Sequence, residues 1–258
     1  MDGEQARVAA VTGASGGIGR AIARRLAVAG AVVEIASRNE AEGGATVELV
    51  EADGGSARFT RVDVTEHDQV EGWIADVHGR HGRLDWLVNN AGTSGGWVRI
   101  EDQSPDDFRE IIETNLLSAC YATRAAIPLM RAQGFGGIVN LGSTASLQGY
   151  ANMSVYVASK HGILGLTRGT ALENADIPIR VNCVCPGLVD TDLMREIEET
   201  LSPGNPGAAL EAFAATVPLK RYATPQDVAN SVAFLLAGES DYITGAAISI
   251  DGGVTSGV

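Results

Sequence analysis

The stretch from residue 7 to residue 36 limits the fold of this chain more than any other part of the sequence. It opens with an apolar run at 7–12, continues through the glycine-rich segment 13–19 and a helical pattern, and reaches a second apolar run at 31–36. Strand, glycine-rich turn, helix and strand in this order are typical of a nucleotide-binding unit. Glycines let the backbone turn tightly and approach a pyrophosphate, which then lies at the helix N-terminus. A tight turn without a ligand is the alternative.

Strands and helices alternate along the rest of the chain. Further strand-like runs lie at 57–62, 84–89, 137–142, 179–184 and 246–250, with helical patterns between them. No repeat, low-complexity tract or linker divides the sequence. We therefore predict one α/β domain over residues 1–258, a Rossmann-like, doubly wound parallel sheet of seven strands with helices on both faces.

Charge and composition narrow the class of ligand. The net charge of −13 argues against nucleic acid and anionic membranes as partners, so a small molecule is the expected one. No apolar run is long enough to span a membrane, and residues 1–7 lack the features of a signal peptide; we expect a cytoplasmic protein. The sequence has three cysteines, Cys120, Cys183 and Cys185. We expect them to be buried free thiols, and no metal site is predicted.

The end of the second strand predicts the choice of cofactor. A carboxylate there would bind the adenosine ribose and select NAD, whereas an arginine can pair with a 2′-phosphate. The sequence reads Ser37-Arg38-Asn39, without an acid, and so favours NADP(H). A solvated loop arginine is the alternative. Asp63, after the third strand, can accept a hydrogen bond from an adenine amino group.

Three side chains suited to proton transfer follow the fifth strand. Tyr156 and Lys160 are four residues apart in a predicted helix and so leave the same face, and Ser143 directly follows the strand. An ammonium near a phenol favours the phenolate, so we expect Lys160 to lower the pKa of Tyr156, while Ser143 stabilises charge on a carbonyl oxygen. The sequence has 17 arginines but only two lysines, and Lys160 is one of the two. Because arginine is bulkier and planar, a lysine at this position favours a compact functional site. A surface tyrosine and lysine on an ordinary helix is the alternative.

Other segments complete the expected site. Asn115 lies inside a helical stretch, where asparagine is locally unfavourable, and such breaks often mark function. We expect the loop with Ser94, Gly95, Gly96 and Trp97 to border the substrate, and residues 190–217, helical with an interruption at 202–207, to form a mobile lid. The histidines His67, His78 and His81 are expected to face solvent.

With these pieces placed, the chain resembles the short-chain dehydrogenase/reductase family over nearly its full length. The resemblance depends on the order and spacing of several motifs: Thr12-Gly13-x-x-x-Gly17-x-Gly19, Asp63, Asn89-Asn90-Ala91-Gly92, Asn115, Ser143, Tyr156-x-x-x-Lys160, and Pro186-Gly187 with Thr191.

The family implies a tetrad and a cofactor site. Tyr156 would be the general acid in reduction, Lys160 would tune it and hold the nicotinamide ribose, Ser143 would polarise the carbonyl, and Asn115 would anchor a water that relays protons to Lys160. The residues expected to bind NADP(H) are Gly13, Ser15, Gly17, Ile18, Gly19, Ser37, Arg38, Asp63, Val64, Asn90, Ala91, Gly92, Tyr156, Lys160, Pro186, Gly187, Val189 and Thr191.

Within the family the chain is most similar to 3-oxoacyl reductases and aromatic polyketide ketoreductases. Such reductases present arginines near the turns before the fifth and sixth strands when their substrate is bound to an acyl carrier protein. Here those turns offer only Arg131, which argues against a carrier-bound substrate. The resemblance also implies a tetramer or a dimer, assembled through the two long central helices and the C-terminal strand region, and a homotetramer is the expected form.

The expected function is therefore NADP(H)-dependent reduction of a ketone to a secondary alcohol, with a 3-oxoacyl or polyketide-like substrate. Oxidation of a secondary alcohol, sugar or steroid is the enzymatic alternative. A non-catalytic NADP-binding regulator is the alternative from another class, and the intact tetrad argues against it.

Overall fold

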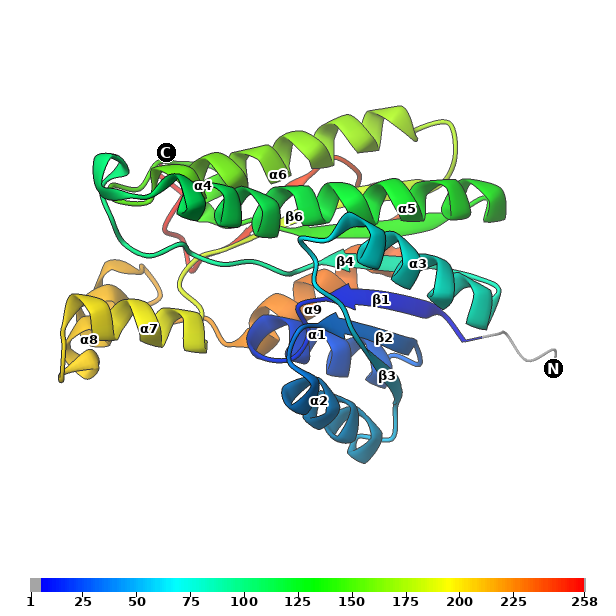
Figure 1. The fold of residues 1–258 in the computed structure, drawn as a ribbon, viewed down its shortest axis with the longest axis horizontal. Coiled ribbons are helices and arrows are strands. Elements are labelled where there is room, and N and C mark those ends of the chain that lie inside the picture. Colours follow the sequence, from blue (N-terminus) through cyan, green and yellow to red (C-terminus); the bar gives the residue numbers. More distant parts are fainter. Residues whose placement is uncertain (1–5, 258) are drawn as a thin grey trace.

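The computed structural model describes residues 6–257. The core of the structure is a parallel sheet (Figure 1). Its strands are β1 (Val8–Thr12), β2 (Val32–Ser37), β3 (Ser56–Arg61), β4 (Trp86–Asn89), β5 (Gly136–Leu141), β6 (Ile179–Pro186) and β7 (Ala247–Ile250). The order is β3-β2-β1-β4-β5-β6-β7, and every neighbouring pair is parallel. The prediction of a doubly wound sheet of seven parallel strands is confirmed, with strand ends within two residues of those expected.

Burial on both faces explains why residues 8–11 of the inner strand β1 form a continuous apolar run. In β1, Ala9 and Val11 belong to one hydrophobic cluster, whereas Val8 and Ala10 belong to another on the opposite face. All five residues of β1 are buried. A polar residue at these positions would therefore lose its contact with water on either side of the sheet.

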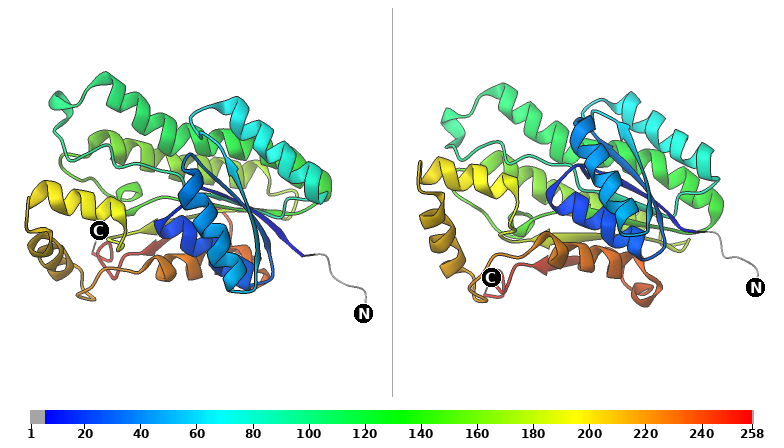
Figure 2. Two further views of the ribbon diagram at one scale, coloured as in Figure 1. Left: turned by 60° about the horizontal axis from the view of Figure 1, so that its bottom comes forward. Right: turned by 90° about the horizontal axis from the view of Figure 1, so that it is seen from below.

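Helices cover both faces of the sheet, as the views in Figures 1 and 2 show. Helices α1 and α9 pack against one face and contact each other, while α3, α5 and α6 pack against the other. The helices are α1 (Gly17–Val28), α2 (Glu40–Ala52), α3 (His67–His81), α4 (Pro105–Ile112), α5 (Ser118–Gln133), α6 (Ser154–Glu173), α7 (Asp192–Leu201), α8 (Pro206–Thr216) and α9 (Pro225–Leu236). No helix within residues 6–257 is long and apolar enough to cross a membrane.

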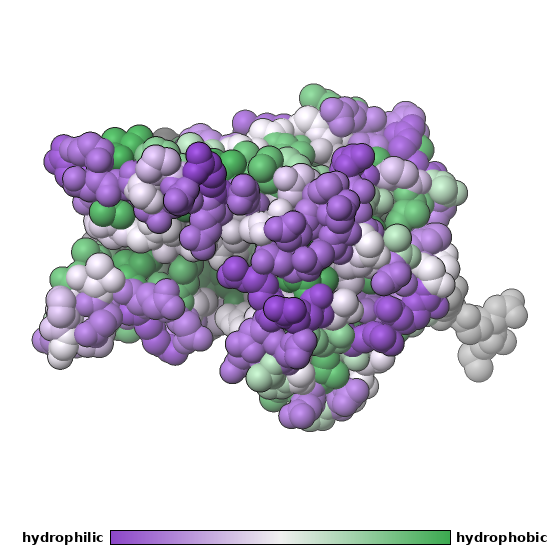
Figure 3. Space-filling model, in the orientation of Figure 1, coloured by the Kyte–Doolittle hydropathy of each residue, from purple (hydrophilic) through white to green (hydrophobic). Residues whose placement is uncertain are grey.

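The strand order places the functional end of the sheet. The chain leaves β1 toward β2 and β3, then returns to the other side of β1 with β4, and ligands of such sheets bind where the order reverses. Helices α7 and α8 extend from this end, with a break at 202–205 that matches the predicted interruption. Figure 3 shows hydrophobic side chains in the hollow between this helical pair and the body above it.

One prediction about surface histidines is wrong for His81. His67 is exposed and His78 half-buried, but Nε2 of His81 lies 2.7 Å from Oε1 of Glu34. Glu34 is only 1% exposed within β2, and Arg80 donates to the same oxygen at 2.7 Å. The end of α3 therefore turns two basic side chains inward onto a buried carboxylate. Arg80 and His81 follow Glu34 by 46 and 47 residues, so the local sequence does not reveal these contacts.

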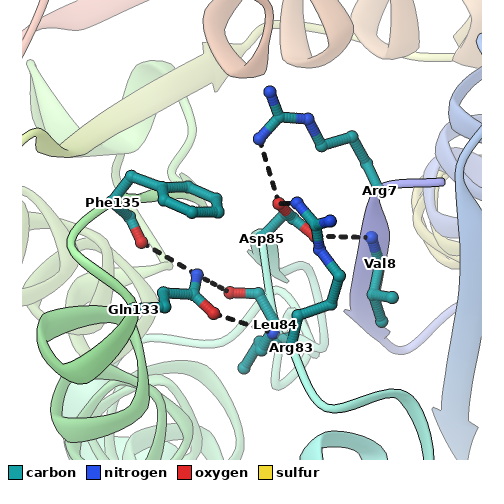
Figure 4. A network of polar contacts seen from close by, with 7 residues as sticks. All are labelled: Arg7, Val8, Arg83, Leu84, Asp85, Gln133 and Phe135. Atoms are coloured by element: carbon teal, nitrogen blue, oxygen red, sulfur yellow. Dashed lines mark hydrogen bonds and ion pairs between the residues drawn. The ribbon is translucent and has the colours of Figure 1, made fainter. Parts of the chain in front are cut away.

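A second buried carboxylate lies at the amino-terminal ends of the central strands β1 and β4 (Figure 4). Asp85, with a fully buried side chain, accepts a hydrogen bond from the backbone N–H of Val8 at 2.8 Å and pairs with Arg7 and Arg83 at 3.0 and 2.5 Å. Both guanidinium groups also lie over the ring of Phe135, at 5.3 and 5.7 Å from its centroid. This cluster joins the starts of β1 and β4, away from the site described next.

Candidate active site

Side-chain hydrogen bonds join the ends of β1 and β4. The Thr12 hydroxyl accepts from the N–H groups of Asn90 and Ala91 at 3.0 and 3.2 Å. The Asn90 amide donates to the carbonyl oxygens of Thr12 and Gly13 at 3.0 and 2.9 Å. The glycine-rich turn is therefore fixed against the loop that follows β4.

Close packing explains two of the glycines in the turn. Gly13 has φ +66°, and a Cβ on Gly19 would lie 2.4 Å from the Gly13 carbonyl oxygen and 2.5 Å from the Asn90 amide nitrogen. A Cβ on Gly16, by contrast, would meet open space. The turn is compact on its inner side and open on its outer side.

The start of α1 is suited to an anion. Its N-cap is Gly16, which provides no capping side chain, and the first turn contains no acidic residue. The first N–H groups of a helix then need another acceptor, and the helix dipole favours a negative one. The residues present therefore fit the pyrophosphate of a dinucleotide. Arg20 supports the turn from the side by donating to the Ser15 carbonyl and to Oε2 of Glu42 at 2.6 Å.

The residues predicted for the adenosine end lie at the tips of β2 and β3. Ser37 is the last, buried residue of β2, and Arg38 is exposed beside it. Asp63 accepts from the N–H and hydroxyl of Thr65 at 3.0 and 2.8 Å, and although burial opposes the effect, these bonds and the nearby Arg38 and Arg61 lower its pKa. One carboxylate oxygen of Asp63 is thus already engaged within its own loop.

Ser143, Tyr156 and Lys160 come together in one cavity at the ends of β5 and β6. The cavity has a volume of about 400 Å³. The Lys160 ammonium is buried, lies 5.7 Å from the centroid of the Tyr156 ring, and donates to the Leu141 carbonyl at 2.9 Å. The Ser143 hydroxyl accepts from the Ala145 N–H at 3.1 Å and also bonds to Tyr156. A phenol and a hydroxyl can therefore meet the same substrate oxygen.

The expected lowering of the Tyr156 pKa is wrong for this arrangement. Burial raises the pKa of the phenol, a hydrogen bond with Ser143 opposes that rise, and the phenol of Tyr150 adds to it. Lys160 does not reverse the direction, although its ammonium lies over the phenol ring at 5.7 Å from the centroid; the ammonium donates to the Leu141 carbonyl. At neutral pH Tyr156 therefore holds its proton, the form that a general acid needs.

Burial lowers the pKa of Lys160 from 10.5 to about 8, which predicts a pH-dependent rate. Below that pH the ammonium stabilises a phenolate left by proton donation, and above it this charge is lost. We expect kcat/KM for ketone reduction to fall as pH rises through about 8. Steady-state rates from pH 6.5 to 9.5 measure this fall in kcat/KM. The fall should disappear in Lys160→Ala and remain in Lys220→Ala, which changes the exposed second lysine. An unchanged fall in Lys160→Ala would rule out Lys160 as the titrating group.

Asn115 occupies a distorted turn between α4 and α5. Residues Glu113–Leu117 form a π-helical turn, a feature that often accompanies functional sites. The Asn115 side chain is buried and bonds to both backbone groups of Thr93, at 2.7 and 2.9 Å, and to the Ser159 hydroxyl at 3.0 Å. It thus joins the loop after β4 to α6, beside Lys160.

Some of the predicted site residues line the cavity, and others do not. Those that line it are Ile18, Asn90, Gly92, Ser94, Trp97, Ser143, Tyr156, Lys160, Pro186, Gly187, Val189 and Thr191. Gly95 and Gly96 do not line it; both have positive φ, and a Cβ on Gly95 would lie 2.1 Å from Cδ1 of Ile111. The two glycines shape the loop, and its ends, Ser94 and Trp97, face the cavity.

Several lining residues were not named individually by the sequence analysis, although the first group below lies in the segment 190–217 that it expected to cover the substrate. The helical pair α7–α8 contributes Leu193, Met194, Ile197, Phe213 and Thr216. The segment between Ser143 and α6 contributes Thr144, Ala145, Tyr150 and Met153. Only the helical periodicity of 192–217 signalled the first group. The second had no sequence signal, because the segment between Ser143 and α6 contains only a single short helical turn, at 144–146, and so shows no periodicity.

Cys183 and Cys185 lie beneath the site on β6. Both are buried, and their sulfur atoms are 3.7 Å apart on one strand face, as predicted. A Cβ on Gly142 would lie 2.7 Å from the sulfur of Cys183, so only glycine fits between this pair and Ser143. The thiols therefore pack tightly under the loop that begins at Ser143.

Comparison with known proteins gives full-length similarities. Residues 13–255 match the family model described as enoyl-(acyl carrier protein) reductase. The chain is 35% identical to a 3beta-hydroxysteroid dehydrogenase of Mediterraneibacter gnavus, over 97% of this chain and 95% of the relative. It is 36% identical to levodione reductase of Leifsonia aquatica, over 96% of this chain and 93% of the relative.

Two solved structures share the fold. A crystal structure of an actinorhodin polyketide ketoreductase variant with NADPH superposes with a TM-score of 0.93 at 35% identity and covers 98% of this chain and 99% of its own. An NAD⁺-bound xylitol dehydrogenase superposes with a TM-score of 0.89 at 32% identity and covers 95% of this chain and 97% of its own.

Proposed function

The chain belongs to the short-chain dehydrogenase/reductase family of oxidoreductases, and on that premise we propose that it uses NADP(H) to reduce a ketone to a secondary alcohol. The observation that carries the proposal is the convergence of Ser143, Tyr156 and Lys160 in one cavity at the switch point of the sheet. Turnover of a panel of neutral ketones with NADPH tests it. Absence of any NADPH-dependent reduction would overturn it.

Each polar side chain of the site has a proposed role. Tyr156 donates its proton to the carbonyl oxygen as charge develops there, and Ser143 donates a hydrogen bond to the same oxygen. Lys160 stabilises the resulting phenolate and holds the nicotinamide ribose, and Asn115 anchors a water that returns protons through Lys160. A bound nicotinamide supplies the hydride.

The walls of the cavity favour an uncharged substrate. Among its lining residues within 6–257, Lys160 is the one charged side chain, and Trp97, Leu193, Met194 and Phe213 provide apolar surface. A 3-oxoacyl or polyketide-like ketone fits such walls. A carrier-bound form is disfavoured, because Arg131 is already paired with Asp176 at 2.8 Å.

Preference for NADPH is proposed from Arg38 at the tip of β2. Charge-assisted hydrogen bonds to a phosphate contribute about 1.5–3 kcal/mol, so Arg38→Ala should raise KM for NADPH roughly 10- to 100-fold and leave KM for NADH nearly unchanged. Initial rates with both cofactors measure this. Arg168→Ala, at an exposed position of α6, is the matched control. Equal effects on both cofactors, or a wild-type preference for NADH, would contradict the assignment.

Oxidation of a secondary alcohol, sugar or steroid is the second candidate. The similarity to a 3beta-hydroxysteroid dehydrogenase and to a xylitol dehydrogenase favours it. The same tetrad serves both directions, since Tyr156 can accept the proton that it donates in reduction. Comparing kcat/KM for a ketone with NADPH and for its alcohol with NADP⁺ at one pH separates the two candidates.

We further propose that the protein works in the cytoplasm as a homotetramer. Exposed apolar side chains lie on and beside α9 and at the end of α6, with Phe234, Tyr242 and Leu172 between 49% and 104% exposed. Light scattering coupled to size-exclusion chromatography measures the assembly. A monomer at micromolar concentration would contradict this proposal.

A further inference from the structure

Two free thiols lie side by side beneath the cavity. Cys183 and Cys185 are two residues apart on β6, both side chains are buried, and their sulfur atoms are 3.7 Å apart. The third cysteine, Cys120, is half-buried on a different element, α5. The proposed ketone reduction gives neither sulfur atom of β6 a role.

The surroundings of the two sulfur atoms make their reactivity unequal. A hydrogen bond from Cys183 lowers the pKa of Cys185; burial opposes this, while the Ser143 N–H, the Ser146 hydroxyl and the charge of Lys160 lower the pKa further. The same hydrogen bond, together with burial, raises the pKa of Cys183. Because the thiolate is the nucleophilic form of cysteine, Cys185 is the thiol that reacts first, with Cys183 in contact as a second thiol.

A single glycine separates the pair from the cavity. Gly142 lines the cavity, and a Cβ at this position would lie 2.7 Å from the sulfur of Cys183 and 3.1 Å from that of Cys185. At this point the wall between the cavity and the sulfur atoms is one residue thick and carries no side chain. A neutral oxidant of nearly the size of water, such as hydrogen peroxide, therefore needs only a small local opening to reach Cys185.

We propose that Cys183 and Cys185 form an oxidisable dithiol, a modification site for hydrogen peroxide that reversibly lowers the activity of the enzyme. The Cys185 thiolate attacks one peroxide oxygen, the O–O bond breaks, and the products are a sulfenic acid and hydroxide, which takes up the proton that Cys185 released. The Cys183 sulfur then attacks the Cys185 sulfur; the S–S bond forms as the S–O bond breaks, and a second water leaves. Two thiols are oxidised to one disulfide, and one peroxide is reduced to two waters.

The geometry of β6 explains why the disulfide would change activity. Two residues in a strand have Cα atoms about 6.6 Å apart, at the upper end of the 4.4–6.8 Å range of disulfides, and the sulfur atoms must close to about 2.05 Å. Closure therefore bends the strand and withdraws Cys185 from Ser143 and Ser146, the loop that carries the proposed carbonyl donor. A bond formed under strain is also more easily reduced, which makes the modification reversible.

Peptide mass spectrometry tests the modification itself. The full-length protein is reduced, freed of reductant, treated in its folded state with hydrogen peroxide, then alkylated in denaturant and digested with trypsin. Cleavage after Arg180 and Arg195 releases residues 181–195, which contain both cysteines of β6. We expect this peptide to appear unalkylated and lighter by two hydrogen atoms than its fully reduced form, while Cys120 remains alkylated. A peptide alkylated at both cysteines, or one with oxygen atoms on a cysteine and no disulfide, would overturn the inference.

Activity measurements test the consequence, which rests on the proposed function. Oxidised wild-type protein should reduce the ketone roughly 10- to 100-fold more slowly, because small displacements of reacting groups are costly, and dithiothreitol should restore the rate. Cys120→Ala is the matched control and should respond as wild type does. Cys185→Ala should keep its rate in peroxide, and Cys183→Ala should lose activity that dithiothreitol does not fully restore, because its sulfenic acid oxidises further.

The outcomes separate the two proposals. A disulfide that leaves ketone reduction unchanged, or a reversible loss of activity that persists in Cys185→Ala, would overturn the regulatory role and leave the proposed function in place. If the alanine variants do not fold, the wild-type peptide and the recovery of activity with dithiothreitol decide the question. Failure of the fully reduced protein to reduce any ketone would overturn the proposed function and the regulatory role, whereas the mass of residues 181–195 would still decide whether the dithiol is oxidised.

Discussion

Tyr156→Phe should lower kcat for ketone reduction by roughly 100- to 10,000-fold, the range that a positioned general acid contributes. The variant removes one oxygen atom and its proton while keeping the ring that lies beside Lys160. The raised pKa keeps the Tyr156 phenol protonated at neutral pH, so the wild-type side chain carries the proton that the variant lacks. Single-turnover reduction, followed by the absorbance of NADPH, measures the loss.

Two measurements make the Tyr156 result specific. NADPH affinity, measured by fluorescence, should change by no more than about threefold, which separates chemistry from cofactor binding. Tyr242→Phe is the matched control, because Tyr242 is fully exposed and distant from the cavity lining. Full activity in Tyr156→Phe would refute the assigned acid.

Asp85→Ala should lower the free energy of unfolding by about 3–5 kcal/mol, the effect of removing one partner from a buried ion pair. Its carboxylate is fully buried and satisfies Arg7, Arg83 and the N–H of Val8 at once (Figure 4). Removal takes the carboxylate from the exposed Arg7 and the partly buried Arg83, and it leaves a backbone donor at the start of β1 without its partner. Urea denaturation, monitored by tryptophan fluorescence, measures the loss.

The control for Asp85 is a carboxylate in an exposed pair. Asp176 pairs with Arg131 at 2.8 Å but is 62% exposed, so Asp176→Ala should lower the free energy of unfolding far less than Asp85→Ala does. Asp85→Asn, which keeps the size of the side chain, serves if the alanine variant does not fold. Losses of equal size at positions 85 and 176 would show that burial does not set the energetics of the Asp85 cluster.

Features that depend on neighbouring residues were predictable from the sequence. The strands were found because both of their faces are buried, which makes runs such as residues 8–11 continuously apolar. The glycine turn was recognisable because its conformation needs residues without a Cβ at fixed spacing. The asparagine at 115 indicated the irregular turn, since its polar side chain conflicts with a helix interior.

Features that depend on distant contacts were not predictable. The direction of the Tyr156 pKa shift follows from burial by loops that come from several parts of the chain. Lys160 donates to the Leu141 carbonyl, 19 residues earlier, and His81 contacts Glu34, 47 residues earlier. The hydrogen bonds among Thr144, Gln148 and Tyr150 are short in sequence, but they form in an irregular loop with no periodicity to signal them.

Isotope transfer tests the central claim most directly. Wild-type protein is given a reducible ketone and NADPH that carries deuterium at the transferring position of its nicotinamide, in ordinary water. We predict one deuterium on the carbinol carbon of the alcohol, and a solvent-derived proton on its oxygen that passes through Tyr156. An alcohol with no deuterium on that carbon would contradict hydride transfer at this site.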